Sequence, residues 1–338
     1  MSHVIDFRSD TVARPGTAMR QAMADAEVGD DVFNDDPTTQ KLETLAAETL
    51  GKDAALLAPS GTQTNLVALL THCGRGDEYI VGQAAHTYLY EGGGGAALGS
   101  IQPQPLTIEP DGTLDLEKVA RLIKPDDFHY ARTRLLCLEN TSHGRVLPLP
   151  YLQAARAFVD KHNLRLHLDG ARLFNAAIAS GHSPADIAAP FDSISFCLSK
   201  GLGAPVGSLL VGSQSFIDQA RRWRKVVGGG LRQSGLLAAA GIYALEHHVD
   251  RLANDHILAQ TLADGLAAIP NVTIDYAATN MVFARFPDPE ALAAHLARNN
   301  ILIFPGTPTR LVTHLDLDQD AIANCVDSVA EYAKQKSH

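Results

Sequence analysis

The stretch that decides the fold is Ser193–Gly207, which reads SISFCLSKGLGAPVG. An apolar run with the pattern of a buried strand ends at Ser199 and Lys200, and a glycine-rich turn follows it. A lysine is rarely placed beside a protein core without a partner, because burying an ammonium group is costly. Lys200 is therefore a candidate for the amine that forms a Schiff base with pyridoxal phosphate. The alternative is a lysine that simply emerges at a strand end, and this stretch alone does not separate the two.

The preceding strand adds a carboxylate to the same region. Residues Arg165–Arg172 read RLHLDGAR, an apolar strand that ends in Asp169 before a helix begins. A pyridoxal cofactor needs a carboxylate beside its ring nitrogen, which keeps the ring protonated and able to accept electrons. Asp169 lies 31 residues before Lys200, one strand–helix unit, so both fit at the carboxyl edge of one sheet. Taken alone, Asp169 equally suits the cap of the following helix.

A phosphate site is indicated by Ala58–Asn65, which reads APSGTQTN and joins a strand, a turn and a helix start. Backbone N–H groups at a helix N-terminus bind phosphate, and Gly61 and Thr62 bring such donors close to a ligand. No Walker-type Gly-Lys-Ser/Thr follows this turn. A nucleotide- or sugar-binding protein without covalent chemistry therefore stays an alternative, although the lysine site argues against it.

Short apolar runs alternate with helical patterns through most of the chain. This alternation predicts an α/β fold with a doubly wound, mostly parallel sheet, whose ligand lies at the carboxyl ends of the strands. The pattern changes near Ser234, where one long helix or two tandem helices lead into a small α+β unit. We therefore expect a large domain over residues 1–250, including the N-terminal segment, and a small C-terminal domain over 251–338. The strands expected in the large domain are Ala54–Ala58, Tyr79–Gly82, Arg134–Glu139, Arg165–Asp169, Ser193–Leu198 and Ser208–Val211.

Composition places the 338-residue chain among ordinary globular proteins, with 46% hydrophobic and 20% charged residues. Its formal net charge of −10 argues against nucleic acid or an anionic membrane surface as a partner. No apolar run approaches the ~20 residues of a membrane span, and the first eleven residues hold no apolar signal core. The cysteines form no CxxC pair, so no disulfide framework and no metal site is expected, and the predicted compartment is the cytoplasm.

Several motifs between Ile5 and Tyr332 resemble the L-threonine aldolase family, which consists of pyridoxal-phosphate enzymes of the aspartate aminotransferase fold (fold type I). The motifs that carry this resemblance are IDFRSDTVARP (Ile5–Pro15), VGDDVFNDDP (Val28–Pro37), LENT (Leu138–Thr141), HLDGAR (His167–Arg172), LSKGLG (Leu198–Gly203) and LVTHL (Leu311–Leu315). The resemblance implies a lyase that binds pyridoxal 5'-phosphate.

The resemblance assigns roles in cofactor binding. Lys200 would be the Schiff-base lysine, and Asp169 the partner of the pyridine nitrogen. Gly61 and Thr62 would hold the phosphate, while His86 would stack on the pyridine ring.

The same resemblance assigns roles on the substrate side and across an interface. Arg172 would lie near the phenolic oxygen of the cofactor and the substrate carboxylate, which Ser9 and Arg310 would also bind. Arg232 would reach the phosphate of a neighbouring subunit, in a homotetramer built as a dimer of dimers. His129 would approach the substrate hydroxyl, so the base that removes the hydroxyl proton is His86 or His129.

Two departures from the family pattern concern the substrate side. Phe33 stands where relatives often have Tyr, and Ser142-His143-Gly144 stand where they often have His-Asn-Gly. The function implied is cleavage of the β-hydroxy amino acids L-threonine and L-allo-threonine to glycine and acetaldehyde, with low specificity at Cβ. The alternative within the same cofactor class is a β-eliminating lyase or an aminotransferase, which would share the lysine and the aspartate.

Overall fold

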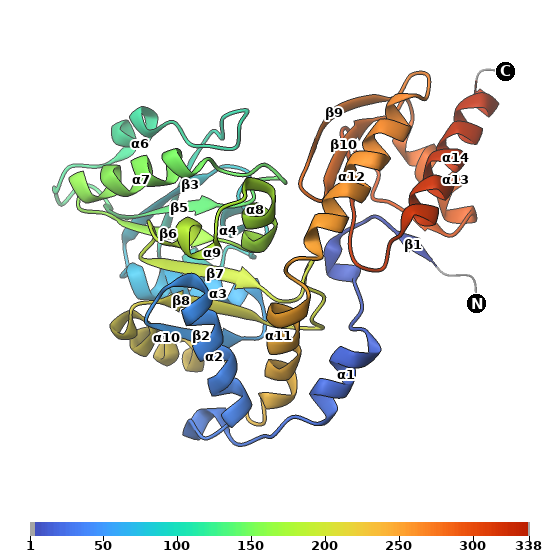
Figure 1. The fold of residues 1–338 in the computed structure, drawn as a ribbon. Helices are drawn as coiled ribbons and strands as arrows, with labels where there is room; N and C mark the ends of the chain where they lie inside the picture. Colours follow the sequence, from blue (N-terminus) through green and yellow to red (C-terminus); the bar gives the residue numbers. More distant parts are fainter. Residues whose placement is uncertain (1–3, 337–338) are drawn as a thin grey trace.

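The computed structural model describes residues 4–336 and shows two lobes (Figure 1). The larger lobe is built on a seven-stranded sheet, and the smaller lobe carries a three-stranded sheet. The tandem helices α11 (Gly235–His247) and α12 (Leu252–Ala267) follow one another, and the chain passes from the larger lobe to the smaller between them.

The large sheet has the strand order β2-β8-β7-β6-β5-β3-β4. All neighbouring strands are parallel except β8, which runs antiparallel to both β2 and β7. The expected mostly parallel sheet is therefore confirmed. Its strands are β2 (Ala54–Ala58), β3 (Asp77–Gly82), β4 (Gln102–Leu106), β5 (Arg132–Glu139), β6 (Arg165–Asp169), β7 (Ser193–Cys197) and β8 (Ser208–Gly212).

Helices cover both faces of this sheet, which explains why its central strands are apolar along their whole length. In β8, Leu209 and Leu210 enter different core clusters, because successive side chains of a strand point to opposite faces. One face packs against α3 and α10, and the other against α7, α8 and α11. The helices of the large lobe that precede α11 are α2 (Pro37–Leu50), α3 (Gly61–His72), α4 (His86–Leu89), α5 (Gly94–Gly99), α6 (Leu116–Leu122), α7 (Leu149–Lys161), α8 (Leu173–Ser180), α9 (Pro184–Ala188) and α10 (Gln214–Val226).

The small lobe has its own apolar core. Its antiparallel sheet has the order β12-β10-β9, and α12 and the last two helices pack with it. A further parallel pair joins the N-terminal strand β1 to β11. The bounds are β1 (Ile5–Asp6), β9 (Thr273–Ala278), β10 (Met281–Arg285), α13 (Pro289–Arg298), β11 (Ile301–Leu302), β12 (Thr309–Val312) and α14 (Gln319–Lys336).

The N-terminal segment contacts both lobes. The sequence grouped it with the large domain, yet β1 pairs with β11 and the fully buried Phe7 packs into the core of the small lobe. The chain then continues through α1 (Thr17–Ala24), which packs on α11. Residues 7–16 therefore run beside the junction of the two lobes, where the sequence motif Ile5–Pro15 lies.

One strand of the large sheet was not expected from the sequence. The edge strand β4 has the sequence QPQPL, and prolines are tolerated only at a sheet edge because they lack the N–H that pairs a strand on both sides. Its composition carries no apolar run. None of the helices within residues 4–336 combines the length and the apolar character that crossing a bilayer demands.

Candidate active site

The carboxyl ends of the central strands meet at one edge of the large sheet, and a cavity of about 560 Å³ lies there against the small lobe. Glu139 at the end of β5 is in register with Asp169 at the end of β6, and Lys200 follows β7. The small lobe closes the other side with Phe283 of β10 and Arg310 of β12. The polar side chains that line the cavity are Ser9, Thr11, His86, Tyr90, Glu139, His143, Arg172, Lys200 and Arg310.

Among the residues that line the cavity, Lys200 is the best candidate for a nucleophile. It is half-buried, and among residues 4–336 its amine has neither a hydrogen bond nor an ion pair. Its charge nevertheless acts on several neighbours, since it helps to lower the pKa of Asp10 and offsets part of the rise that burial causes in the pKa of Glu139 and Cys197. An amine held near carboxylates but bound by none is available to a ligand.

Asp169 is held in a fixed orientation below the cavity. Only 4% of the residue is exposed. Its Oδ1 accepts a hydrogen bond of 3.1 Å from the amide of Ala171, and its Oδ2 accepts one of 2.8 Å from Asn65 Nδ2. The same Asn65 nitrogen donates to Glu91 Oε1 at 2.8 Å. The buried carboxylate is therefore preorganised to pair with a cationic ring nitrogen.

His86 at the start of α4 is connected to two acidic side chains. Its backbone N–H donates to Glu139 Oε2 at 2.7 Å, and its ring Nδ1 lies 2.8 Å from Glu91 Oε1. The hydrogen bond to Glu91 raises the pKa of His86. Burial raises the pKa of Glu91, and burial together with the charge of Asp169 raises that of Glu139. Perturbed acids and bases gathered in a cleft are typical of an active site.

The N-terminus of α3 offers a phosphate site beside these groups. Ser60 caps the helix by accepting from the amide of Gln63 at 3.2 Å. The amides of Gly61 and Thr62 make no hydrogen bond to any residue that the structure describes. A Cβ at position 61 would approach Cys197 Sγ to 2.7 Å, so only glycine fits between the helix and β7. Unpaired donors at a helix N-terminus suit an anion.

Two arginines bring positive charge to the substrate side. Arg172 binds the fully buried Asp10 through two hydrogen bonds of 2.7 Å, and Asn280 also donates to Asp10 at 3.2 Å. Arg310 is less constrained, because its guanidinium makes a single hydrogen bond of 3.4 Å to the carbonyl of Arg8. Burial and then the charge of Arg172 lower the pKa of Arg310. A guanidinium with free donors in a cavity is suited to a carboxylate.

Ser9 lies beside these arginines on the N-terminal segment. Its side chain accepts hydrogen bonds from the amide and the hydroxyl of Thr11, at 3.2 and 2.9 Å. This short helical turn presents both hydroxyls to the cavity. The structure thus brings together Lys200, Asp169, His86, Arg172, Arg310 and Ser9, with the Gly61–Thr62 turn at the same sheet edge.

Six of the predicted residues are not among those that line the cavity, namely Asp169, Gly61, Thr62, His129, Arg232 and Phe33, and the last three are exposed side chains. His129 lies on an exposed loop, where its ring Nδ1 is 2.7 Å from Asp127. Arg232 makes an exposed ion pair with Asp30 at 3.0 Å. Phe33 is 75% exposed and lies under the Arg232 guanidinium, with 6.0 Å between that group and the ring centroid.

Other site residues escaped the sequence analysis. Glu139 carried a detectable signal, because it ends an apolar strand in the same way as Asp169. His143, in one of the segments that departs from the family pattern, lines the cavity, and burial lowers its pKa. Asn65 and Glu91 carried no signal, because their roles depend on hydrogen bonds between segments far apart in the sequence.

The residues present fit pyridoxal phosphate in their chemistry, since a free amine, a buried carboxylate and unpaired helix N-terminal amides are the groups that its aldehyde, ring nitrogen and phosphate would need. The fold is that of the fold type I pyridoxal-phosphate enzymes. A threonine aldolase of Leishmania major has a TM-score of 0.84 at 23% identity, covering 97% of this chain and 99% of that one. A serine palmitoyltransferase of Sphingomonas wittichii has a TM-score of 0.76 at 18% identity, covering 99% and 88%.

Sequence relatives are much closer. The chain is 55% identical to the low specificity L-threonine aldolase of Escherichia coli K12, over 95% of this chain and 96% of that one. It is 45% identical to low-specificity L-threonine aldolase 1 of Arabidopsis thaliana, over 91% and 89%. The beta-eliminating lyase family matches residues 6–288, and the chain belongs to this family, among its threonine aldolases. The predicted family is confirmed.

Proposed function

We propose that this protein is a pyridoxal-phosphate-dependent L-threonine aldolase that cleaves L-threonine and L-allo-threonine to glycine and acetaldehyde. The observation that carries the proposal is the unpaired amine of Lys200 beside the buried carboxylate of Asp169, in a chain 55% identical to a low specificity L-threonine aldolase. The reaction breaks the Cα–Cβ bond, and the hydroxyl proton leaves as the aldehyde forms.

The cofactor site uses four features of the chain. Lys200 would hold the cofactor covalently through its amine, and Asp169 would pair with the ring nitrogen. The free amides of Gly61 and Thr62 would bind the phosphate, and the ring of His86 would cover the pyridine face. When bound, pyridoxal phosphate supplies an electron sink for the pair released from the broken bond.

The substrate carboxylate would be bound by Arg310 and Ser9. Arg310 has free donors in the cavity, and a guanidinium grips a carboxylate through two parallel hydrogen bonds. Arg172 would contribute charge from the side, since Asp10 fixes its position. A carboxylate fixed by Arg310 and Ser9 would hold the substrate in one orientation, so that its Cα–Cβ bond is the one presented for cleavage.

His86 is the base that the geometry favours for the hydroxyl proton. If Nδ1 donates to Glu91, the other ring nitrogen presents its lone pair to the cavity, and the carboxylate stabilises the imidazolium that forms. His129 stays the second candidate by family resemblance, and in this chain it lies on an exposed loop. After the aldehyde has formed, His86 would return the proton to Cα, which gives glycine.

Assembly would complete the site. Arg232 and Phe33 form an exposed pair on a glycine-rich surface, which supports a dimer in which Arg232 reaches the phosphate site of the neighbouring subunit. Two such dimers would make a homotetramer. The four cysteines are free and buried, which fits the reducing cytoplasm as the compartment.

A product assay tests the proposal. The purified protein with added pyridoxal phosphate should convert L-threonine to equal amounts of glycine and acetaldehyde. Formation of 2-oxobutanoate and ammonia would show a β-eliminating lyase. In a parallel assay with an added 2-oxo acid as the amino-group acceptor, formation of an oxo acid from threonine without ammonia would show an aminotransferase. A protein that stays colourless with the cofactor and converts no amino acid would refute the whole class.

A further inference from the structure

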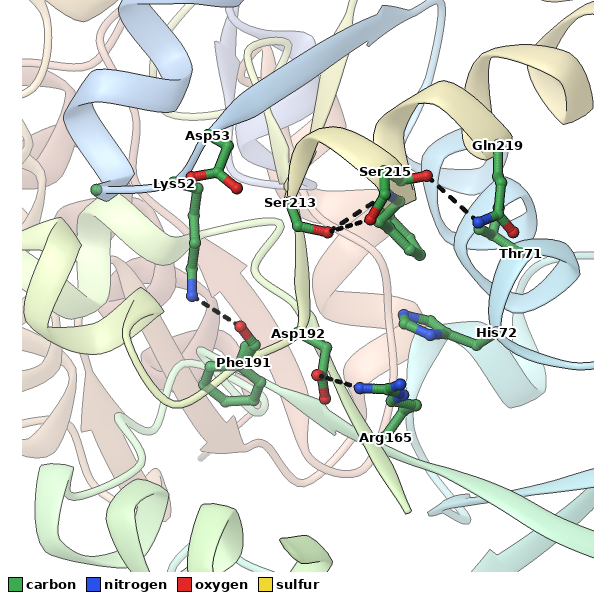
Figure 2. Close-up of a pocket in the computed structure, with 12 residues that line it drawn as sticks. Lys52, Asp53, Thr71, His72, Arg165, Phe191, Asp192, Ser213, Ser215 and Gln219 are labelled. Carbon is green, nitrogen blue, oxygen red and sulfur yellow. Dashed lines mark hydrogen bonds and ion pairs between the residues drawn. The ribbon is translucent and has the colours of Figure 1, made fainter. Parts of the chain in front are cut away.

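A second cavity, of about 610 Å³, opens at the opposite edge of the large sheet (Figure 2). It lies where β6 and β7 begin and where α3 ends, so the length of the strands separates it from Lys200. Lys52 donates to the carbonyl of Phe191 at 2.8 Å, and Arg165 pairs with Asp192 at 3.2 Å, so the cationic side chains of the wall already have partners. The remaining titratable groups in the wall are Asp53, whose Oδ2 accepts from the amide of Gln214 at 3.4 Å, and His72, the last residue of α3.

An unbroken chain of hydrogen bonds connects His72 to the candidate active site. His72 Nε2 is 2.7 Å from Ser193 Oγ, and Ser193 Oγ is 2.8 Å from His167 Nδ1. His167 Nε2 is 3.2 Å from Asn65 Oδ1. Asn65 Nδ2 then donates to Asp169 Oδ2 at 2.8 Å. This hydrogen-bond network runs along the face of the sheet that α3 covers, from the second cavity to Asp169 at the carboxyl edge.

The carboxylates at the end of this hydrogen-bond network determine which atom donates in each of its hydrogen bonds. Asn65 faces carboxylate oxygens of Glu91 and Asp169, which only accept, so its nitrogen must point to them. Its oxygen therefore faces His167, whose Nε2 must carry the proton. A neutral His167 then accepts at Nδ1 from the only proton of Ser193, and Ser193 accepts from His72.

Both histidines have the neutral form that this order requires. His167 is completely buried, and burial lowers its pKa to about 3. Burial likewise lowers the pKa of His72 to about 4, and its ring stacks on Phe216 with 4.6 Å between centroids. A neutral imidazole has one donor and one acceptor, so the hydrogen bonds on one nitrogen decide the tautomer at the other.

We propose that Asn65 and His167 are positioning residues for Asp169, and that Ser193 and His72 fix the tautomer of His167 from the opposite edge of the sheet. The inference deepens the proposed function and rests on Asp169 as the partner of the cofactor ring nitrogen. If His167 took the other tautomer, its Nε2 lone pair would face Asn65 Oδ1. The amide would then turn its oxygen toward two carboxylates, and the orientation of Asp169 would be lost.

Ser195 gives Asn65 a second donor, with its hydroxyl 2.5 Å from Asn65 Oδ1. Ser195 is bonded to Asn65 but does not connect Asn65 to the second cavity. Ser195 alone already favours the observed orientation of the Asn65 amide, and Ser193 and His72 add to this preference. Removing Ser193 or His72 should therefore have a moderate effect on cofactor binding.

Two substitutions at His167 separate positioning from packing. His167→Gln keeps an N–H donor near the position of Nε2, and His167→Asn keeps a group near that of Nδ1, while both remove the ring. With the full-length apoprotein, we expect His167→Gln to bind pyridoxal phosphate within about twofold of wild type, and His167→Asn to bind it about fivefold more weakly, the effect of one hydrogen bond. Equal affinities for the two variants would overturn the proposal.

A second set of variants tests the outer links without disturbing Asn65. Ser193→Ala should weaken pyridoxal phosphate binding about fivefold in the wild-type background. In the His167→Gln background, Ser193→Ala should have no further effect on binding. The glutamine amide has no alternative tautomers, so Ser193 has no tautomer to fix there. Thr71→Val is the matched control, since Thr71 lines the same cavity next to His72, and within residues 4–336 its hydroxyl donates only to the carbonyl of Val67.

The readouts distinguish failure of this inference from failure of the proposed function. Affinity is measured by titrating each apoprotein with pyridoxal phosphate and following the visible absorbance, and thermal unfolding of the apoproteins reports stability separately. The proposal fails if Ser193→Ala and Thr71→Val have the same affinity for pyridoxal phosphate, or if the affinities of all variants simply follow their thermal stabilities. In either case the hydrogen-bond network from His72 to Asp169 has only a structural role. If wild type itself gains no visible absorbance, the proposed cofactor is wrong.

Discussion

Breaking the ion pair between Asp10 and Arg172 is the strongest test of which contacts stabilise the candidate active site. Asp10 is fully buried, and 14% of the Arg172 side chain is exposed. Asp10→Asn keeps the size of the side chain but leaves the Arg172 charge without its carboxylate. Removing one partner of a buried pair costs about 3–5 kcal/mol. A chain of 338 residues has an unfolding entropy of about 0.7 kcal/mol per degree, so we expect the unfolding temperature to fall by about 4–7 °C.

The effect should also depend on pH. Burial alone would raise the pKa of Asp10, but the charge and hydrogen bonds of Arg172 outweigh it and lower the pKa from 3.8 to about 2. The resulting stabilisation, about 2 kcal/mol, is present above pH 3.8 and is lost as the pH falls toward 2. The difference in unfolding temperature between wild type and Asp10→Asn should therefore be constant near neutrality and shrink in this acid range.

Scanning calorimetry of the apoproteins from pH 7 to pH 3 measures both effects. Asp6→Asn is the matched control, because Asp6 pairs with the more exposed Arg8 on the same segment, and such pairs contribute at most about 1 kcal/mol. The double variant Asp10→Asn/Arg172→Gln should recover part of the stability but none of the activity. An unfolding temperature of Asp10→Asn within about 1 °C of wild type, or a difference that grows toward acid, would refute the reasoning.

Other predictions concern the proposed reaction. Lys200→Ala should abolish both turnover and the visible absorbance with pyridoxal phosphate, because the structure offers no other unpaired lysine amine in the cavity; retention of both would contradict the assignment. Arg310→Lys should lower kcat as well as raise KM, since an ammonium group cannot hold a carboxylate through two parallel bonds; an effect on KM alone would mean that Arg310 binds without orienting. The two Cβ epimers of L-threonine should differ in kcat/KM by less than ~10³, because a pocket that distinguishes a methyl from a hydroxyl supplies only ~1–3 kcal/mol; a larger ratio would reveal a stringent hydroxyl site.

The strand-end residues show what local sequence determines. An apolar run buried on both faces can only be a core strand, so the polar residue that ends it must lie at a sheet edge, which identified Lys200 and Asp169. Parallel strands place such ends at the same edge of a sheet, and β6 and β7 are neighbours there. The fold class followed from the same alternation of strands and helices, and the family followed from motifs that are local in sequence.

Tertiary structure alone decided which side chains support those residues. Asn65 reaches Asp169 across 104 positions of sequence, and Arg172 reaches Asp10 across 162, so no local pattern could pair them. The N-terminal segment contacts both lobes, since Phe7 packs into the core of the small lobe and Met19 into that of the large lobe, and no local pattern in the sequence shows which core each residue enters. Sequence periodicity reports whether a residue is buried, whereas the choice of its partner depends on the packing of the whole chain.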